Sequence, residues 1–383
     1  MTFNRRDLLA TGLAAGTLPL LGATPSFGQG TTFKPEQGAS LRMLRWAPFV
    51  KGDEDQWIAN TKKFTEATGV EVRIDKESWE DIRPKAATAA TAGSGPDIMM
   101  VWFDDPFQYP DKLLDVTDLA TYLGGKYGGW YAGPESYGKR GDRFIDLPLA
   151  VIGNGICYRQ SMIEAAGFKE VPKDTKGFLE LAKALKYARE LYQQFIPGTE
   201  SWLDINNNRA FLAGDVSLTA NGVSLYYSAK NDPKLADLGK DIKTVALPVG
   251  PVGKAIELAQ TTECVIFKYT KFPNAAKAYL QFMYEKPQMD AWISASSAYC
   301  CPALKGFIDN PVWTSDPNHA AYKAASETLR PNGYAGPLGP GSAAAMADYI
   351  MVDMVAEAAT GQRSPEDAAK RAEQRATRAY RNS

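Results

Sequence analysis

The sequence predicts an α/β protein of two lobes, with mostly parallel sheets flanked by helices. Segments with a strand pattern alternate with segments with a helix pattern between residues 41 and 102, and this alternation is typical of parallel sheets. A chain of 383 residues is also long for one hydrophobic core and suits two compact lobes. A helix–glycine–strand unit over 204–222 ends at Asn221-Gly222. Ligands of open α/β sheets bind at strand ends, so Asn221 is a candidate site residue.

The amino-terminal part of the chain predicts three strands and two helices in alternation. Residues 41–46 and 70–74 have strand patterns, and the helix between them is expected to end at Gly69. A second helix is expected to begin near Trp79. The strand at 97–102 is apolar almost throughout, which predicts burial on both faces of the sheet.

The unit over 204–222 predicts a short helix followed by a half-buried strand. Asp204 or one of the asparagines after it is expected to cap the helix, which Gly214 ends. Val216, Leu218 and Ala220 then alternate with polar residues. This period of two predicts that these apolar side chains face the core.

Composition excludes several function classes. The chain has 43 Lys and Arg against 44 Asp and Glu, so it lacks the basic excess of nucleic-acid-binding proteins. His319 is the only histidine, which argues against His-based catalytic triads and His-rich metal sites. The sequence contains no phosphate-binding P-loop, dinucleotide fingerprint or CxxC motif. We therefore expect no nucleic acid partner, no cofactor and no metal.

The cysteines do not indicate a disulfide scaffold. Four cysteines, at positions 157, 264, 300 and 301, are too few to brace so long a chain. A bridge between the adjacent Cys300 and Cys301 is not expected. We expect buried free thiols instead.

Residues 1–28 are expected to be an export signal of the twin-arginine type. Arg5-Arg6 precedes an apolar run, and Ser26-Phe27-Gly28 offers small residues for cleavage near Gly28/Gln29. A fortuitous arginine pair before an ordinary secretory signal is the alternative, and it also exports the protein. The apolar run is short for a membrane span, and no cysteine in the first 156 residues offers a lipid anchor. We expect a soluble periplasmic protein.

Several motifs in order resemble one protein family. Gly95-Pro96-Asp97, an apolar strand and then Asp104 form the first, and the helix–glycine–strand unit forms the second. The third is the segment over 361–369, in which Ser364 and Pro365 open the last helix. These motifs resemble bacterial extracellular solute-binding proteins of ABC importers, in particular the sugar-binding group that includes maltose-binding protein. The resemblance covers nearly all of 40–380, by the order of elements more than by identity.

The resemblance implies a type II periplasmic binding protein-like fold with a hinge between its lobes. Lobe 1 is then expected to comprise 29–147 and 250–300, and lobe 2 to comprise 148–249 and 301–383. The implied function is capture of a small polar solute by hinge closure. The implied solute is a carbohydrate such as a sugar or polyol, and the implied partners are permease subunits in the inner membrane. A monomer is expected.

The chain departs from the family at three places. Relatives have a strand-plus-helix unit at the position of the Lys186/Tyr187 junction, and we expect a deletion of this unit here. The alternative is one long helix over 175–195. Ser224 stands where maltose-binding protein has a sugar-stacking tryptophan. The late helix beginning at Ser342 has no aromatic residue before Tyr349. A maltodextrin is therefore not the expected solute, whereas another carbohydrate is.

The candidate site residues combine aromatic rings with hydrogen-bonding groups. Ring faces can cover the C–H face of a sugar, while carboxylate and amide groups bind its hydroxyls. Core packing is the alternative for each tryptophan, and Trp57 and Trp292 are assigned to the core. The candidates are Trp46, Phe49, Trp79, Trp102, Asp104, Trp130, Asn221 and Tyr226.

Two other functions compete with a binding protein that performs no catalysis. The first is a secreted carbohydrate-active enzyme that uses Asp104 as an acid/base, because glycosidases need a pair of carboxylates. Adjacent acidic residues such as Asp104-Asp105 and Asp53-Glu54-Asp55 are more typical of solvated loops and helix starts. The second is a chaperone-like or receptor-scaffold role without a solute.

Overall fold

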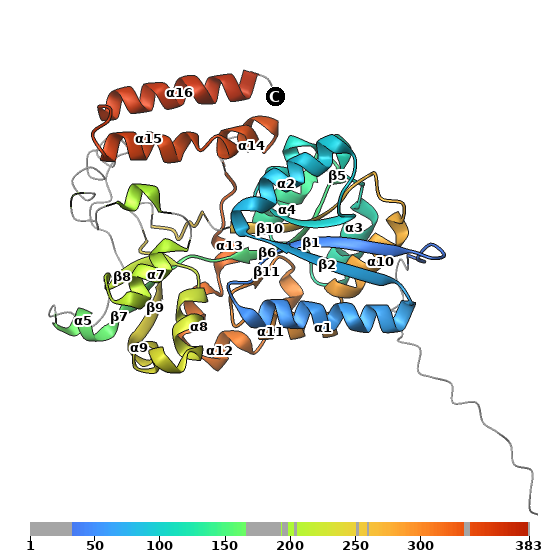
Figure 1. Ribbon diagram of the computed structural model, residues 1–383, viewed down its shortest axis with the longest axis horizontal. Helices are drawn as coiled ribbons and strands as arrows, with labels where there is room; N and C mark the ends of the chain where they lie inside the picture. Colours follow the sequence, from blue (N-terminus) through green and yellow to red (C-terminus); the bar gives the residue numbers. More distant parts are fainter. Residues whose placement is uncertain are drawn as a thin grey trace, which may run out of the picture.

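The computed structural model describes two lobes, each built from one main sheet and its helices (Figure 1). The predicted export signal, Asp204 and the Lys186/Tyr187 junction lie outside the described residues, and of 175–195 only residue 193 is described. The described residues are 33–165, 193, 198–202, 205–249, 253–258, 260–332 and 338–381.

The larger lobe contains a six-stranded sheet of order β11-β6-β10-β3-β1-β2. The three predicted strands are confirmed, and β1 pairs in parallel with both β2 and β3. Pairing elsewhere is antiparallel, because β10 and β11 run against β3 and β6. The sheet is therefore mixed, which corrects the expectation of mostly parallel sheets. Its strands are β1 (Ser40–Trp46), β2 (Glu71–Glu77), β3 (Ile98–Trp102), β6 (Leu147–Ile152), β10 (Gln260–Ile266) and β11 (Cys301–Pro302).

Helices cover both faces of this sheet. In Figure 1, α1 and α11 lie on one side and α2 and α4 on the other. Gly69 and Gly93 end α1 and α2 in left-handed conformations with φ of 74° and 63°, as glycine allows at little cost. The helices of this lobe are α1 (Lys51–Thr68), α2 (Trp79–Ala92), α3 (Thr117–Lys126), α4 (Ala132–Gly138), α10 (Pro273–Tyr284), α11 (Lys286–Ala295) and α13 (Ala325–Thr328).

The smaller lobe contains a three-stranded antiparallel sheet of order β8-β7-β9. Gly214 ends α7 at φ 89°, as predicted. Antiparallel pairing here also differs from the expected parallel sheets, because each strand returns beside β7. The elements are β7 (Gly155–Arg159), α5 (Gln160–Ala165), α7 (Asn206–Ala213), β8 (Leu218–Asn221), α8 (Ser224–Asn231), α9 (Ala236–Asp241), β9 (Ile242–Ala246) and α12 (Val312–Ser315).

Strand β8 turns its polar side chains toward α7, and this corrects the predicted orientation. Leu218 is 44% exposed and Ala220 is also exposed, whereas Thr219 and Asn221 are half-buried. The reason is hydrogen bonding between the two elements. Asn207 of α7 donates to the Thr219 hydroxyl at 3.4 Å, and the amide of Asn221 donates to Asn208.

The carboxy-terminal helices form a unit with a small core of its own. They are α14 (Pro340–Ala347), α15 (Ile350–Ala359) and α16 (Pro365–Arg381). The Ser364 hydroxyl accepts a hydrogen bond from the Asp367 backbone N–H at 3.1 Å, which confirms the predicted cap. Helix α14 packs on the 3-10 segment Asp105–Gln108 of the larger lobe. Among the described residues no helix has the length and apolarity to cross a membrane.

The sheets place the boundary between the lobes differently from the sequence. The predicted boundary at 147/148 cuts β6, and that at 300/301 separates β11 from its sheet; both strands belong to the larger lobe. We propose that the chain crosses between the lobes at 153–154 and between β9 and β10, and again on each side of α12, which lies between β11 and α13 in the sequence. All four cysteines are buried and free, as predicted.

A buried ion pair connects β1 to α1 in the larger lobe. Arg45 Nη2 lies 2.5 Å from Asp53 Oδ2, and both side chains are fully buried. The Trp292 indole donates to the other Asp53 oxygen at 2.7 Å. Trp57 and Trp292 are each 1% exposed, which confirms their assignment to the core. Asp53 therefore has a structural role.

Asp53→Ala is expected to destabilise the protein by roughly 3–5 kcal/mol, because it leaves the Arg45 guanidinium buried without an anion. Urea unfolding followed by tryptophan fluorescence measures this change. Asp55→Ala is the matched control, since its side chain is 57% exposed and pairs only with Lys51 one turn away. That variant is expected to change stability by less than about 0.5 kcal/mol. Equal losses in the two variants would contradict the assignment.

Two carboxyl groups lie buried in the interior of the larger lobe. Asp146 and Glu263 are both 0% exposed, and their oxygens accept no hydrogen bond from the described residues. Burial raises the pKa of both carboxyls well above the usual range, and the nearby Asp146 charge raises the pKa of Glu263 further. The folded state therefore keeps protons that the unfolded chain releases.

Because these pKa values are raised, the contribution to stability is complete below the unfolded pKa of about 4 and is lost as pH rises. Glu263→Gln cannot ionise, so we expect its stability relative to wild type to rise between pH 4 and pH 9. Thermal unfolding at both pH values gives this difference. The exposed Glu66→Gln control is expected to show no such difference. A constant offset for Glu263→Gln at all pH values would refute the protonated state.

Candidate functional site

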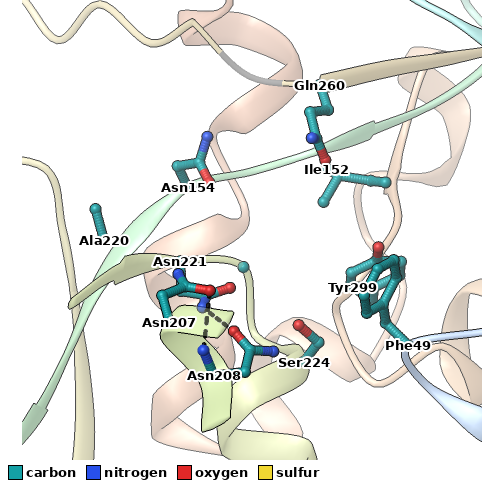
Figure 2. A pocket seen from close by; sticks show the side chains of 11 residues that line it. Phe49, Ile152, Asn154, Asn207, Asn208, Ala220, Asn221, Ser224, Gln260 and Tyr299 are labelled. Atoms are coloured by element: carbon teal, nitrogen blue, oxygen red, sulfur yellow. Dashed lines mark hydrogen bonds between the residues drawn. The ribbon is translucent and has the colours of Figure 1, made fainter. Parts of the chain in front are cut away.

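A cavity of about 450 Å³, open to solvent, lies between the two lobes (Figure 2). One wall comes from the larger lobe, and the other comes from α7, the end of β8 and the start of α8. The crossing residue Asn154 contributes between them. The cavity is lined by Phe49, Ile152, Asn154, Asn207, Asn208, Ala220, Asn221, Gly222, Ser224, Gln260 and Tyr299.

Neutral polar side chains dominate the lining. It carries four asparagines, one glutamine and one serine, and no lining residue has a charged side chain. Each primary amide offers two donors and one acceptor oxygen. The bond from Asn221 to Asn208, drawn in Figure 2, uses one donor and fixes the two amides relative to each other. Such a surface can bind groups that both donate and accept hydrogen bonds.

An aromatic cluster adjoins this cavity on the larger lobe. The Phe49 ring lies 6.2 Å from the Tyr299 ring and 5.9 Å, edge to face, from Trp79. Trp79 stacks on Trp102 with ring centroids 4.0 Å apart and planes 8° apart. Trp46 meets Trp79 edge to face at 5.5 Å. The structure thus brings four of the predicted rings together at the ends of β1 and β3.

Of the four predicted rings in this cluster, one lines the cavity itself. Phe49 is half-buried there, whereas Trp46, Trp79 and Trp102 are 0%, 9% and 4% exposed. The buried Trp46 Nε1 has no hydrogen-bond partner among the described residues. These three tryptophans support Phe49 from behind.

Asp104 lies next to this cluster but is fully buried. Phe103 has a left-handed backbone with φ 55°, a strained turn for a residue with a side chain, and it directs Trp102 and Asp104 to different places. Both Asp104 oxygens lack a hydrogen bond of normal geometry within the described chain. Burial raises the Asp104 pKa, and the nearby Ser342 and Asn332 side chains partly oppose that rise. Ser342 belongs to α14, which packs over this turn.

Two predicted site residues lie away from the cavity. The Trp130 indole donates to the Ala120 carbonyl at 3.1 Å, so this ring fills the core of the larger lobe. The Tyr226 hydroxyl donates to Asp316 at 2.6 Å inside the smaller lobe. Both side chains therefore pack and form hydrogen bonds inside their lobes and do not line the cavity.

The sequence missed most of the amide lining. Asn207 and Asn208 were expected at most to cap α7, but no side chain caps this helix and both face the cavity. Asn154, Gln260 and Tyr299 were not singled out. The available signal was the run of three asparagines at the start of the helix that precedes a strand ending in Asn-Gly.

Both the sequence and the fold are similar to those of known proteins. The model of the family described as bacterial extracellular solute-binding protein matches residues 51–290, more than half of the chain. The diacetylchitobiose binding protein DasA of Streptomyces coelicolor is 25% identical over 189 residues. That alignment covers 48% of this chain and 42% of the relative, so the chain spans less than half of the relative's length in the match.

Solved structures share the two-lobed fold at low identity. Maltose-bound MalE3 of T. maritima gives a TM-score of 0.73 at 14% identity, covering 88% of this chain and 99% of that one. A solute-binding protein of Thermotoga lettingae bound with α-D-tagatose gives 0.72 at 15% identity, covering 89% and 99%. The GacH receptor of Streptomyces glaucescens, solved also with acarbose, gives 0.67 at 15% identity, covering 90% and 98%. These likenesses confirm the predicted fold class, and the family match identifies the chain as a member of the bacterial extracellular solute-binding proteins.

Proposed function

We propose that this protein is the substrate-binding component of an ABC importer that captures a neutral carbohydrate. The observation that carries the proposal is the cavity between the lobes, where amides of the smaller lobe face the rings of Phe49 and Tyr299. Closure of the lobes about the crossing segments would surround the solute. The closed form then delivers it to permease subunits in the inner membrane.

The lining matches the chemistry of a sugar. Hydroxyl groups donate and accept hydrogen bonds, and the side-chain amides do the same. Phe49 and Tyr299 supply apolar ring surface for the C–H groups. No lining side chain carries a charge that would neutralise a phosphate or carboxylate. We therefore favour a neutral sugar or polyol over a phosphorylated one.

The relatives support the same solute class. The similar proteins named above bind diacetylchitobiose, maltose, tagatose or acarbose. Ser224 lines the cavity, and maltose-binding protein has a sugar-stacking tryptophan at this position. This favours a carbohydrate other than a maltodextrin.

The proposal includes no catalytic step. Asp104, the acid/base of the enzyme alternative, is buried and does not line the cavity. Its neighbour Asp105 is engaged in an ion pair with Arg83. We further propose that the twin-arginine segment at residues 1–28 exports the protein to the periplasm, where it acts as a monomer.

A neutral sugar that binds the native state is expected to raise the melting temperature. At a concentration one hundred times its Kd, the sugar stabilises the folded protein by about 2.7 kcal/mol. The panel should contain tagatose, maltose, diacetylchitobiose, common monosaccharides and polyols, each beside a phosphorylated analogue where one exists. Thermal shift and tryptophan fluorescence provide two independent readouts. Binding of phosphorylated sugars alone would contradict a neutral solute, and no response across the panel would contradict the carbohydrate assignment.

Asn208→Ala and Asn221→Ala are each expected to weaken binding of the sugar found in that panel by about tenfold, the equivalent of one lost hydrogen bond. Isothermal titration calorimetry measures the change. Asn231→Ala is the matched control in the same lobe, because Asn231 is exposed and bonds only to the Tyr227 carbonyl. Unchanged affinity in both cavity variants would argue against this cavity as the binding site.

A further inference from the structure

An ion pair links α2, the helix that carries Trp79, to the 3-10 segment that follows Trp102. Arg83 Nε lies 2.7 Å from Asp105 Oδ1, with side chains 19% and 1% exposed. Arg83 is one helical turn after Trp79 on α2, so the two side chains share a face of that helix. Asp105 follows Trp102 by three residues at the end of β3. The pair therefore fixes the start of α2 to the end of β3.

The geometry of the stack requires this kind of fixation. Aromatic pairs accept several offset or edge-on arrangements of similar energy, so packing alone specifies the planes weakly. Here the planes are 8° apart at 4.0 Å, and the stack presents its edges to Trp46 and Phe49. A rotation of Trp79 would move Phe49, which lines the cavity.

We infer that Arg83 and Asp105 form a positioning pair that holds the Trp79–Trp102 stack in register and thereby sets the Phe49 ring against the solute. The inference rests on the proposed function, because it gives the pair a role in binding the same solute. Neither residue lines the cavity, so the pair acts through the rings. The charged carboxylate attracts the guanidinium at this distance, and a neutral carboxyl group attracts it much less.

The surroundings make the pair sensitive to pH. Asp105 interacts electrostatically with Arg83 of α2 and Glu263 of β10, and with Asp104 and Tyr109 of the loop that contains Asp105. Arg83 also interacts with Tyr349, which precedes α15. Gln108 donates to Asp105 at 3.2 Å. Burial, opposed by Arg83, raises the Asp105 pKa to about 6. The ion pair therefore exists above that pH and is lost below it.

Loss of the ion pair in acid does not predict loss of folding. A carboxyl with a raised pKa contributes most to stability below its unfolded pKa of about 4, so protonation of Asp105 favours the folded state. Positioning and structural roles thus give different results. A positioning role predicts weaker binding and altered ring coupling in acid with melting temperature retained.

The test compares Asp105→Asn with wild type by circular dichroism and by affinity for the sugar identified above. Two stacked indoles give an exciton couplet in the free protein, and Trp79→Phe provides the zero reference. We expect Asp105→Asn to lose at least about half of the couplet at pH 8 and to bind about tenfold more weakly. Asp111→Asn is the matched control, since Asp111 lies in the adjacent 3-10 turn with its side chain 84% exposed. The wild-type couplet is expected to fall with a midpoint near pH 6, a readout that needs no variant.

A wild-type couplet that stays constant from pH 8 to pH 5, or an Asp105→Asn variant with wild-type couplet and affinity, would overturn the inference. Arg83→Met, which removes the cation, should reproduce the loss at pH 8. If wild type binds no sugar while Asp105→Asn still loses the couplet, the proposed function fails and the positioning of the rings is retained.

Discussion

Stacking of Trp79 on Trp102 is the contact on which the larger lobe's side of the site depends. These rings come from the start of α2 and the end of β3, two points brought together because parallel strands end at the same edge of a sheet. Trp46, at the end of β1, completes the cluster. Phe49 rests against it and reaches the cavity. A buried aromatic layer thus supports the half-buried Phe49 ring in the cavity wall.

Sequence patterns predicted the larger lobe well, because its signals are local. The helix end at Gly69, the helix start near Trp79 and the apolar strand ending at Trp102 each depend on a few neighbouring residues. Strand direction was predicted less well. Whether β10 runs with or against β3 depends on where the chain re-enters the lobe, and no local pattern records that.

Of the predicted site residues, Phe49 and Asn221 line the cavity, and the sequence missed its other amides for a physical reason. Large rings at strand ends are distinctive, yet their local signal does not separate Trp102, which joins the cluster, from Trp130, whose indole finds a backbone carbonyl instead. An asparagine is equally common in turns, caps and binding sites. Asn208 could be assigned to the cavity only once β8 had placed Asn221 beside it.

The side chains that line the cavity are uncharged, whereas several carboxyl groups are buried inside the larger lobe. The lining residues carry amides and hydroxyls, whereas Asp104, Asp146 and Glu263 are buried within the larger lobe. Raised pKa values keep part of this interior protonated, which lowers the cost of burying it. The two buried cations described above, Arg45 and Arg83, are each paired with a carboxylate, Asp53 and Asp105. The same arrangement leaves hydrogen bonding to amides and contact with rings as the available means of recognition, and both favour a neutral molecule with many hydroxyl groups.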